Sequence, residues 1–290
     1  MLALSTQTKR IGWMQIMLLK TWLAEAEGKL QGLVPSRQPK CLVALENEDL
    51  IALVVFQPNN RRGSCWAISF PEFIKEPQKT SKRDICKKLL RKAIELENSI
   101  AKNWVVRVPA INMDQLSVCR ELGFQPLKKL KLWQYKLIRI EEIEKHVYPK
   151  NIYWENLSKA NAKSLFQLKK SSESVQLREL LDIQWLDLLD KNQPTNGILI
   201  NKTTDSTKTI LGLITPLCAE DPLSLELVRD LAWDSRLEKV LPKTLCDLKQ
   251  KQPYISVETS SDDKELTNLL AIINWQQQSE IVILGRSILK

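Results

Sequence analysis

The chain has 290 residues, of which 43% are hydrophobic and 27% charged, and a formal net charge of +9. This composition is typical of a globular protein and excludes a low-complexity chain, and the length predicts two domains, residues 1–145 and 146–290. The first half has 25 Lys and Arg against 15 Asp and Glu, and the second half 18 against 19, so an anionic ligand or partner is expected for the first half only.

Apolar residues recur at helical or strand-like spacing along the first half, with polar turns between the segments. The predicted elements are, in order, a helix at 11–30, strands at 41–45, 49–56 and 65–70, a long helix at 85–100, a strand at 104–108, a helix at 114–122 and a strand at 131–137. Short turns join the first three strands, which predicts an antiparallel meander. Gly123 is expected to end the 114–122 helix.

The second half repeats this order of elements without repeating the letters. We expect a strand at 152–157, helices at 160–170 and 175–190, strands at 197–201, 209–215 and 223–231, a helix at 237–248, a strand at 254–258, a helix at 264–273 and a strand at 280–286. The chain is therefore expected to be an internal duplication.

The sequence argues against a membrane protein and against a metal protein. The longest clean apolar run is Leu50–Phe56, far short of the roughly 18 residues of a membrane span. The stretch Ile11–Leu19 has the spacing of a buried amphipathic helix rather than of an export signal. Six cysteines without a C-x-x-C pair, and His146 as the one histidine, predict reduced thiols in a cytoplasmic protein without zinc.

Two segments at corresponding places in the halves carry a family resemblance. Residues 112–124, NMDQLSVCRELGF, follow the meander, the long helix and one further strand, and residues 263–275, DKELTNLLAIINW, take the same place in the second half. The order of elements and the first of these segments resemble the GNAT N-acyltransferases, in which a short helix ends in Leu-Gly-Phe before the last strand. The resemblance implies an α/β (α+β) fold of two tandem GNAT-like domains, each a mixed, mostly antiparallel sheet flanked by helices.

In that family, a loop of the form Q/R-x-x-G-x-G/A before the long helix binds the pyrophosphate of an acyl-CoA through backbone N–H groups. A helix N-terminus favours an anion, and glycines let it approach. Placed on this sequence, the loop has Asp84 and Cys86 in place of the glycines. The resemblance assigns acetyl-CoA or another acyl-CoA to Lys79, Lys82, Arg83, Asp84, Ile85, Cys86 and Lys87. The carboxylate of Asp84 would repel a phosphate there.

The second half departs further from the donor-site pattern. Arg236 takes a suitable position, but Lys239 and Leu241 replace both glycines. The family's tyrosine, which protonates the leaving thiolate, corresponds to Cys119 in the first half and Leu270 in the second. The alternative for Cys119 is a core thiol. Glu72, just past the third strand, is the candidate general base, and a solvated surface glutamate is the alternative.

Several more basic residues crowd the region of the predicted donor loop. Together with the residues assigned above, they can hold phosphates as point charges, or they can be the solvent face of an amphipathic helix. These additional residues are Lys75, Lys88, Arg91 and Lys92. Arg61 and Arg62 are interpreted as hairpin-turn residues next to Gly63.

Three functions remain open at this point. The first is an acyl-CoA-dependent N-acyltransferase with an amine acceptor and an atypical donor site in the first half. The second is a non-catalytic pseudo-enzyme that interacts with a protein partner. The third is RNA binding by the basic half, which lacks recognition-helix, RNP and KH motifs.

Overall fold

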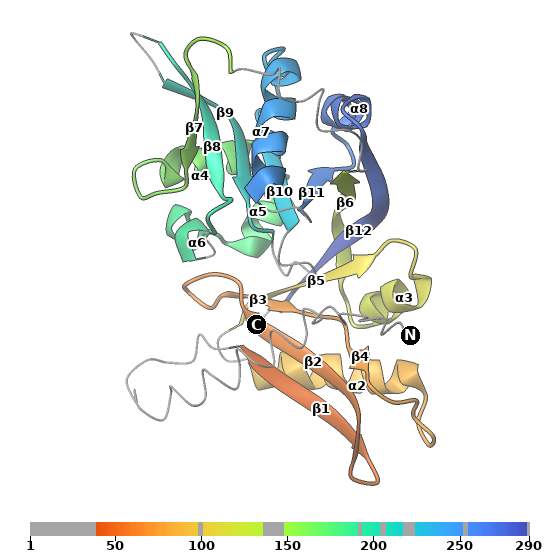
Figure 1. Ribbon diagram of the computed structural model, residues 1–290. Helices are drawn as coiled ribbons and strands as arrows, with labels where there is room; N and C mark the ends of the chain where they lie inside the picture. Colours follow the sequence, from red (N-terminus) through yellow and green to blue (C-terminus); the bar gives the residue numbers. More distant parts are fainter. Residues whose placement is uncertain are drawn as a thin grey trace, which may run out of the picture.

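The computed structural model describes residues 39–97, 101–135, 148–190, 193–203, 207–216, 224–251 and 255–288. The predicted helix at 11–30 and the segment around His146 lie outside these residues. The described residues form a twelve-stranded, mostly antiparallel sheet with helices on both faces, which confirms the predicted fold class (Figure 1).

The first half contains the predicted meander, long helix and closing helix. Its elements are β1 Lys40–Glu46, β2 Asp49–Pro58, β3 Cys65–Ile68, β4 Glu72–Phe73, α2 Lys82–Leu96, β5 Asn103–Pro109, α3 Met113–Glu121 and β6 Gln125–Tyr135. The predicted third strand is interrupted after Ile68, and the chain then pairs with β2 again as β4. Strand β6 begins at Gln125, six residues earlier than predicted from its apolar pattern.

The second half follows the predicted order with one correction. Its elements are β7 Ile152–Asn156, α4 Ala162–Ser172, α5 Val175–Leu181, α6 Trp185–Asp190, β8 Gly197–Lys202, β9 Thr207–Ile214, β10 Ser224–Arg229, α7 Leu237–Lys251, β11 Ser256–Ser260, α8 Lys264–Ile272 and β12 Trp275–Ser287. The single helix predicted at 175–190 is two helices, because Asp182 adopts a left-handed conformation with φ of 47° that ends α5.

The closing segments of the two halves adopt the same local structure. Asn112 caps α3 by accepting a hydrogen bond from the Gln115 N–H, and Asp263 caps α8 in the same way through Leu266. After each helix the chain turns through a left-handed residue, Gly123 with φ of 81° and Asn274 with φ of 64°. Asparagine is the residue that most readily replaces glycine in this conformation. The duplication is therefore visible in the backbone where the letters differ.

The two halves exchange their last strands. The strand order is β1-β2-β3-β5-β12-β6-β11-β10-β9-β8-β7, so β12 lies between β5 and β6, and β6 lies between β12 and β11. The last strand of each half thus takes the place next to the penultimate strand of the other half. Strands β3 and β5 are parallel, as are β10 and β11, while all other pairs are antiparallel. A single continuous sheet results.

Four apolar cores cover the two faces of this sheet. Helices α2 and α3 pack on one face in the first half, and α7 and α8 pack on the same face in the second. Helices α4, α5 and α6 cover the opposite face. Helix α5 crosses to the first half, where Leu177 and Leu181 pack against Cys65 and Ala67 of β3. Each half therefore completes the core of the other.

The turn between β2 and β3 binds the second half. The buried Asn60 side chain donates hydrogen bonds to the carbonyl oxygens of Leu181 at 3.1 Å and Asp182 at 3.0 Å. The Arg61 N–H donates to Asp187 Oδ1 at 2.8 Å, and Arg62 pairs with Asp182. Gly63 supplies the positive φ of 68° that the sequence predicted for this turn. The two arginines also hold the halves together, which their position in a hairpin did not indicate.

Candidate functional site

The start of α2 gathers the predicted phosphate-binding residues, but its own side chains cap it. Ser81 Oγ accepts a hydrogen bond from the Asp84 N–H at 3.1 Å and donates one to Asp84 Oδ2 at 2.7 Å. This reciprocal pair satisfies one of the first donors of the helix and places a carboxylate at its positive end. Asp84 therefore lies at the position where the resemblance predicts a phosphate.

A second carboxylate occupies the loop that leads into α2. Glu46, the last residue of β1, accepts hydrogen bonds from the backbone N–H groups of Gln78 at 2.7 Å and Lys79 at 2.8 Å. The hydrogen bond from Gln78 has the largest effect and that from Lys79 the next, and both hold the pKa of Glu46 below its ordinary value. Two adjacent backbone N–H groups converging on a carboxylate form an anion site that the chain fills itself.

Three basic side chains at the start of α2 pair with carboxylates. Lys82 pairs with Glu76, while Arg83 and Lys87 both pair with Glu121 of α3. Arg83 Nη2 also donates to Ser117 Oγ at 2.9 Å. Lys87 and then Arg83 lower the pKa of Glu121. These contacts connect α2 to α3.

The two cysteines of the predicted site are buried core residues. Cys119 has 0% and Cys86 4% of its surface exposed, and both belong to the core beneath α2 and α3, as does Ile85. Burial raises the pKa of Cys119 to about 12, with a smaller contribution from Cys86, and burial raises that of Cys86 to about 11. Both thiols are therefore protonated and inaccessible at neutral pH.

Glu72 and Cys119 lie on opposite faces of the sheet. Glu72 pairs with Leu53, which alternates along β2 with Val54 of the core that contains Cys119. Glu72 is exposed at the start of β4, beyond Ile68, where the pairing of β3 with β5 ends. The structure therefore does not bring this carboxylate and this thiol to one reaction centre.

In the second half, the region that corresponds to the predicted donor site is occupied by arginine side chains and their partners. The pairing of β10 with β11 ends at Glu226, and beyond it Arg229 makes a two-pronged ion pair with Asp263, the cap of α8, at 2.7 and 2.6 Å. Its guanidinium also lies over the Trp233 ring, 5.0 Å from the centroid. Arg236, at the start of α7, pairs with Asp234 and lowers its pKa. Both arginines are thus engaged within the chain.

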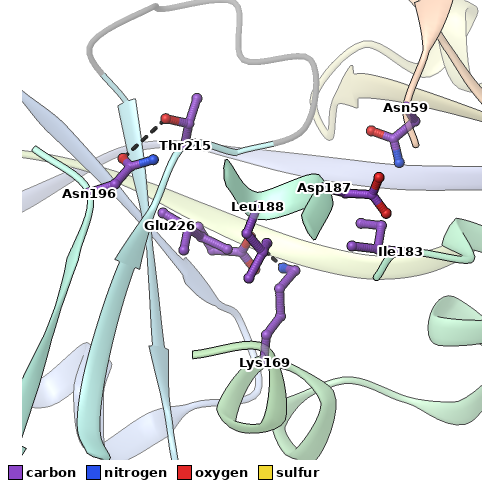
Figure 2. A pocket seen from close by; sticks show the side chains of 9 residues that line it. Asn59, Lys169, Ile183, Asp187, Leu188, Asn196, Thr215 and Glu226 are labelled. Carbon is purple, nitrogen blue, oxygen red and sulfur yellow. Dashed lines mark hydrogen bonds and ion pairs between the residues drawn. The ribbon is translucent and has the colours of Figure 1, made fainter. Parts of the chain in front are cut away.

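A buried charge network at the seam between the halves is the site that sequence reasoning missed. Glu226 of β10 accepts from Lys169 of α4 at 2.9 Å and from Lys128 of β6 at 3.0 Å, and Lys169 also pairs with Glu173 at 2.7 Å. Burial disfavours ionisation of Glu226, yet Lys169 and Lys128 hold its pKa far below the ordinary value. A small cavity beside Lys169 and Glu226, of about 20 Å³, has room for roughly one water (Figure 2).

One more buried ion pair joins the halves. Arg107 of β5 donates from Nη2 to Glu258 Oε1 of β11 at 2.6 Å, and the same oxygen accepts from Ser224 Oγ at 2.9 Å. Sequence analysis missed these charges although they leave a recognisable trace. Arg107 lies between valines and Glu226 between leucines, and a lone charge inside an apolar strand predicts a buried partner.

Within the described ranges, no three His, Cys, Asp or Glu side chains are arranged to hold a metal ion. None of the helices described there is long and apolar enough to cross a membrane.

Solved structures with the same fold include a GCN5-related N-acetyltransferase and a tandem GNAT protein. A GCN5-related N-acetyltransferase from Sphaerobacter thermophilus has 12% sequence identity and a TM-score of 0.55, over 95% of this chain and 91% of its own. A tandem GNAT protein from the clavulanic acid biosynthesis pathway has 11% identity and a TM-score of 0.55, over 95% and 94%. A Drosophila protein has 10% identity and a TM-score of 0.57, over 95% and 90%. No protein-family model and no curated protein matches the sequence.

These similarities confirm the resemblance at the level of the fold: the chain is a tandem GNAT fold. At such identities the similarity says nothing about which residues act, because one fold supports many functions.

Proposed function

We propose that this chain is a non-catalytic GNAT-fold protein that acts by binding a partner, with the donor site of each half closed by the chain's own side chains. The observation that carries the proposal is the pair of carboxylates, Glu46 and Asp84, at the two places where the first half would bind the phosphates of a coenzyme A.

Glu46 and Asp84 support a closed donor site more strongly than the surface ion pairs do. Exposed pairs such as that of Lys82 with Glu76 contribute little stability, and an incoming phosphate could displace them. The hydrogen bonds of Glu46 are different, because a phosphate would have to replace them and also lie next to Asp84, which it repels. The side chain of Asp84 further obstructs the approach that glycine permits.

The catalytic groups support the same proposal. Cys119 is buried, and Glu72 lies on the other face of the sheet. The candidate acid and the candidate base therefore do not flank one reacting atom. The exchanged strands and buried ion pairs make the halves one body, which suits a protein that presents a fixed surface.

Acyl transfer from an acyl-CoA to an amine is the second candidate. Lys79, Lys82, Arg83 and Lys87 do gather around the start of α2, as an atypical donor site would require. In that case the ligand would displace Glu76 and Glu121 from these cations and use side chains where the family uses backbone.

Thermal unfolding with and without millimolar coenzyme A or acetyl-CoA separates the two candidates. Ligand at 100 times its Kd adds about 2.7 kcal/mol to the free energy of unfolding, which raises Tm by roughly 5 °C for a chain of this size. The non-catalytic proposal predicts no shift. A rise in Tm that Lys82→Ala with Arg83→Ala removes, and that Lys159→Ala with Lys264→Ala retains, would overturn it in favour of the donor site.

A further inference from the structure

A groove lies between β1 and α2, next to the start of α2, and shares Glu46, Lys79 and Ile85 with the predicted donor site. Its volume is about 520 Å³, within the range of ligand and peptide sites. Its apolar surface comes from Val43 and Leu45 of β1 and from Ile85 and Leu89 of α2, while lysines of the α2 side form its rim. Val43 is 49% and Leu45 63% exposed, which is unusual for large apolar side chains on neighbouring positions of one strand face.

Strand β1 is the edge of the sheet on this side (Figure 1). Among the residues that the structure describes, β1 pairs with β2 alone, so its outer N–H and C=O groups face the groove's open side. An exposed edge with apolar side chains is a template for one more strand, and proteins usually cover or charge such edges.

The groove follows the edge rather than one face of the sheet. Ala44 packs toward the core under α2, whereas Val43 and Leu45, its neighbours in β1, point to the other face. All three line the same groove. An extended segment that paired with β1 would contact both sets of side chains at once, which a helix lying on one face would not.

The charge of the rim selects the kind of segment. Lys79, Lys88 and Lys92 line the groove against one carboxylate, Glu46, which already accepts two backbone hydrogen bonds. Lys79 donates to Asn47, and Lys92 lies 3.6 Å from Glu95 in an exposed pair. Lys88 makes no ion pair with the residues that the structure describes. The rim therefore complements an acidic segment.

The same charges disfavour two other occupants. Residues 1–38 of this chain carry five Lys and Arg against two Glu, so they bring net positive charge to a positive rim. A second copy pairing edge to edge would bring the same three lysines and a chain of net charge +9.

We propose that the groove binds an extended acidic segment of a partner protein, which adds to the sheet as a strand along β1. Apolar side chains of the segment cover Val43 and Leu45, and its carboxylates pair with Lys79, Lys88 and Lys92. This interaction gives the partner-binding role proposed above a surface and a class of partner, and it rests on that proposal.

Selection of random ten-residue peptides displayed on phage against the purified full chain tests the proposal. We expect enriched peptides in which acidic and apolar residues alternate. A synthetic copy should slow hydrogen exchange at the amides of residues 40–46, the signature of strand addition. Its Kd should rise at least about tenfold in Lys88→Glu with Lys92→Glu and in Leu45→Lys, and remain unchanged in the control Lys159→Glu with Lys264→Glu.

Three results would overturn the proposal. The first is a selection that yields no binders or peptides without acidic residues. The second is binding that survives Leu45→Lys, or that slows exchange elsewhere than in β1. The third is a concentration-dependent dimer of the free protein that Leu45→Lys dissociates, which would assign the edge to a second copy. The Tm experiment with coenzyme A changes Lys82 and Arg83, which do not line the groove, so either proposal can fail alone.

Discussion

Arg107 and Glu258 form an ion pair between the two halves, with Nη2 and Oε1 2.6 Å apart and side chains only 4% and 2% exposed. The two residues are 151 positions apart in the chain and come from β5 and β11, which the exchanged strands β12 and β6 separate. A charge buried this deeply is tolerated only with its partner. The pair therefore ties the seam of the sheet to one arrangement of the halves.

Removal of one partner of this pair should be costly. Arg107→Met leaves the carboxylate of Glu258 buried with only Ser224 as a donor, and we expect the free energy of unfolding to fall by about 3–5 kcal/mol. Arg107→Met with Glu258→Met should recover most of this loss. Urea unfolding measures both variants. Equal destabilisation by the single and double variants would show that packing, not the uncompensated charge, causes the effect.

The stability of the seam should depend on pH through Glu226. The lysines depress its pKa in the folded state, so its ionised form stabilises the fold above the unfolded pKa of about 4.3, and this contribution is lost as pH falls below that value. Lys169 has a raised pKa, so its contribution is present below about pH 10.4 and is lost above. Between these limits we expect a plateau.

The variant Glu226→Gln isolates the acid limb of this dependence. At pH 7 its free energy of unfolding should be lower by about 3 kcal/mol, because Lys169 and Lys128 lose a buried counter-charge. Between pH 5 and 3 the variant should lose less stability than the wild type. Urea unfolding of both proteins across this pH range measures the difference. An equal loss of stability with falling pH in the variant and the wild type would show that Glu226 does not cause it.

Substitutions at the left-handed residues after α3 and α8 should change stability according to the backbone conformation. Asn274 has φ of 64°, so Asn274→Ala should lower the free energy of unfolding by about 1 kcal/mol, whereas Asn274→Gly should be neutral or stabilising. Gly123→Ala should cost at least as much, although the space around Gly123 would accept a methyl group. Thermal unfolding of the three variants measures these differences. If Asn274→Ala were as stable as Asn274→Gly, the positive φ would not be the cause of the predicted loss.

The β2–β3 turn should hold the second half mainly through Asn60. Asn60→Ala leaves the carbonyl groups of Leu181 and Asp182 without this buried donor and should cost about 1–3 kcal/mol. Arg61→Ala removes an exposed pair with Asp190 and should change stability much less. Urea unfolding of both variants tests the order. A larger effect from Arg61 would mean that the surface pairs carry this interface.

The sequence by itself determined the local structure of each half. Apolar segments with short polar turns between them predicted the meander of β1, β2 and β3, helical spacing predicted α2, and Gly123 predicted the end of α3. These features depend on residues near one another in the chain, through backbone propensity and the period of apolar residues. The duplication followed from the order of elements, and Asn274 repeats the backbone conformation of Gly123 where the letters no longer match.

The predicted phosphate site also consisted of residues close together in the sequence. The tertiary structure showed that carboxylates from other segments lie among them. The sequence placed Lys79, Lys82, Arg83 and Lys87 together, because they share one loop and helix. Only the fold brings Glu46 from 33 residues away to the Lys79 N–H and sets Glu121 between α2 and α3. A cluster of cations therefore became a set of matched charges.

The exchange of β6 and β12 was also decided only by the tertiary structure. Either last strand can offer backbone hydrogen bonds to β5, so hydrogen bonding alone does not choose between them. Packing across the whole sheet does, since Leu177 and Leu181 of α5 complete a core with β3, and Arg107 finds Glu258. Such contacts join residues more than a hundred positions apart, and their energy depends on the desolvation and geometry of both partners at once.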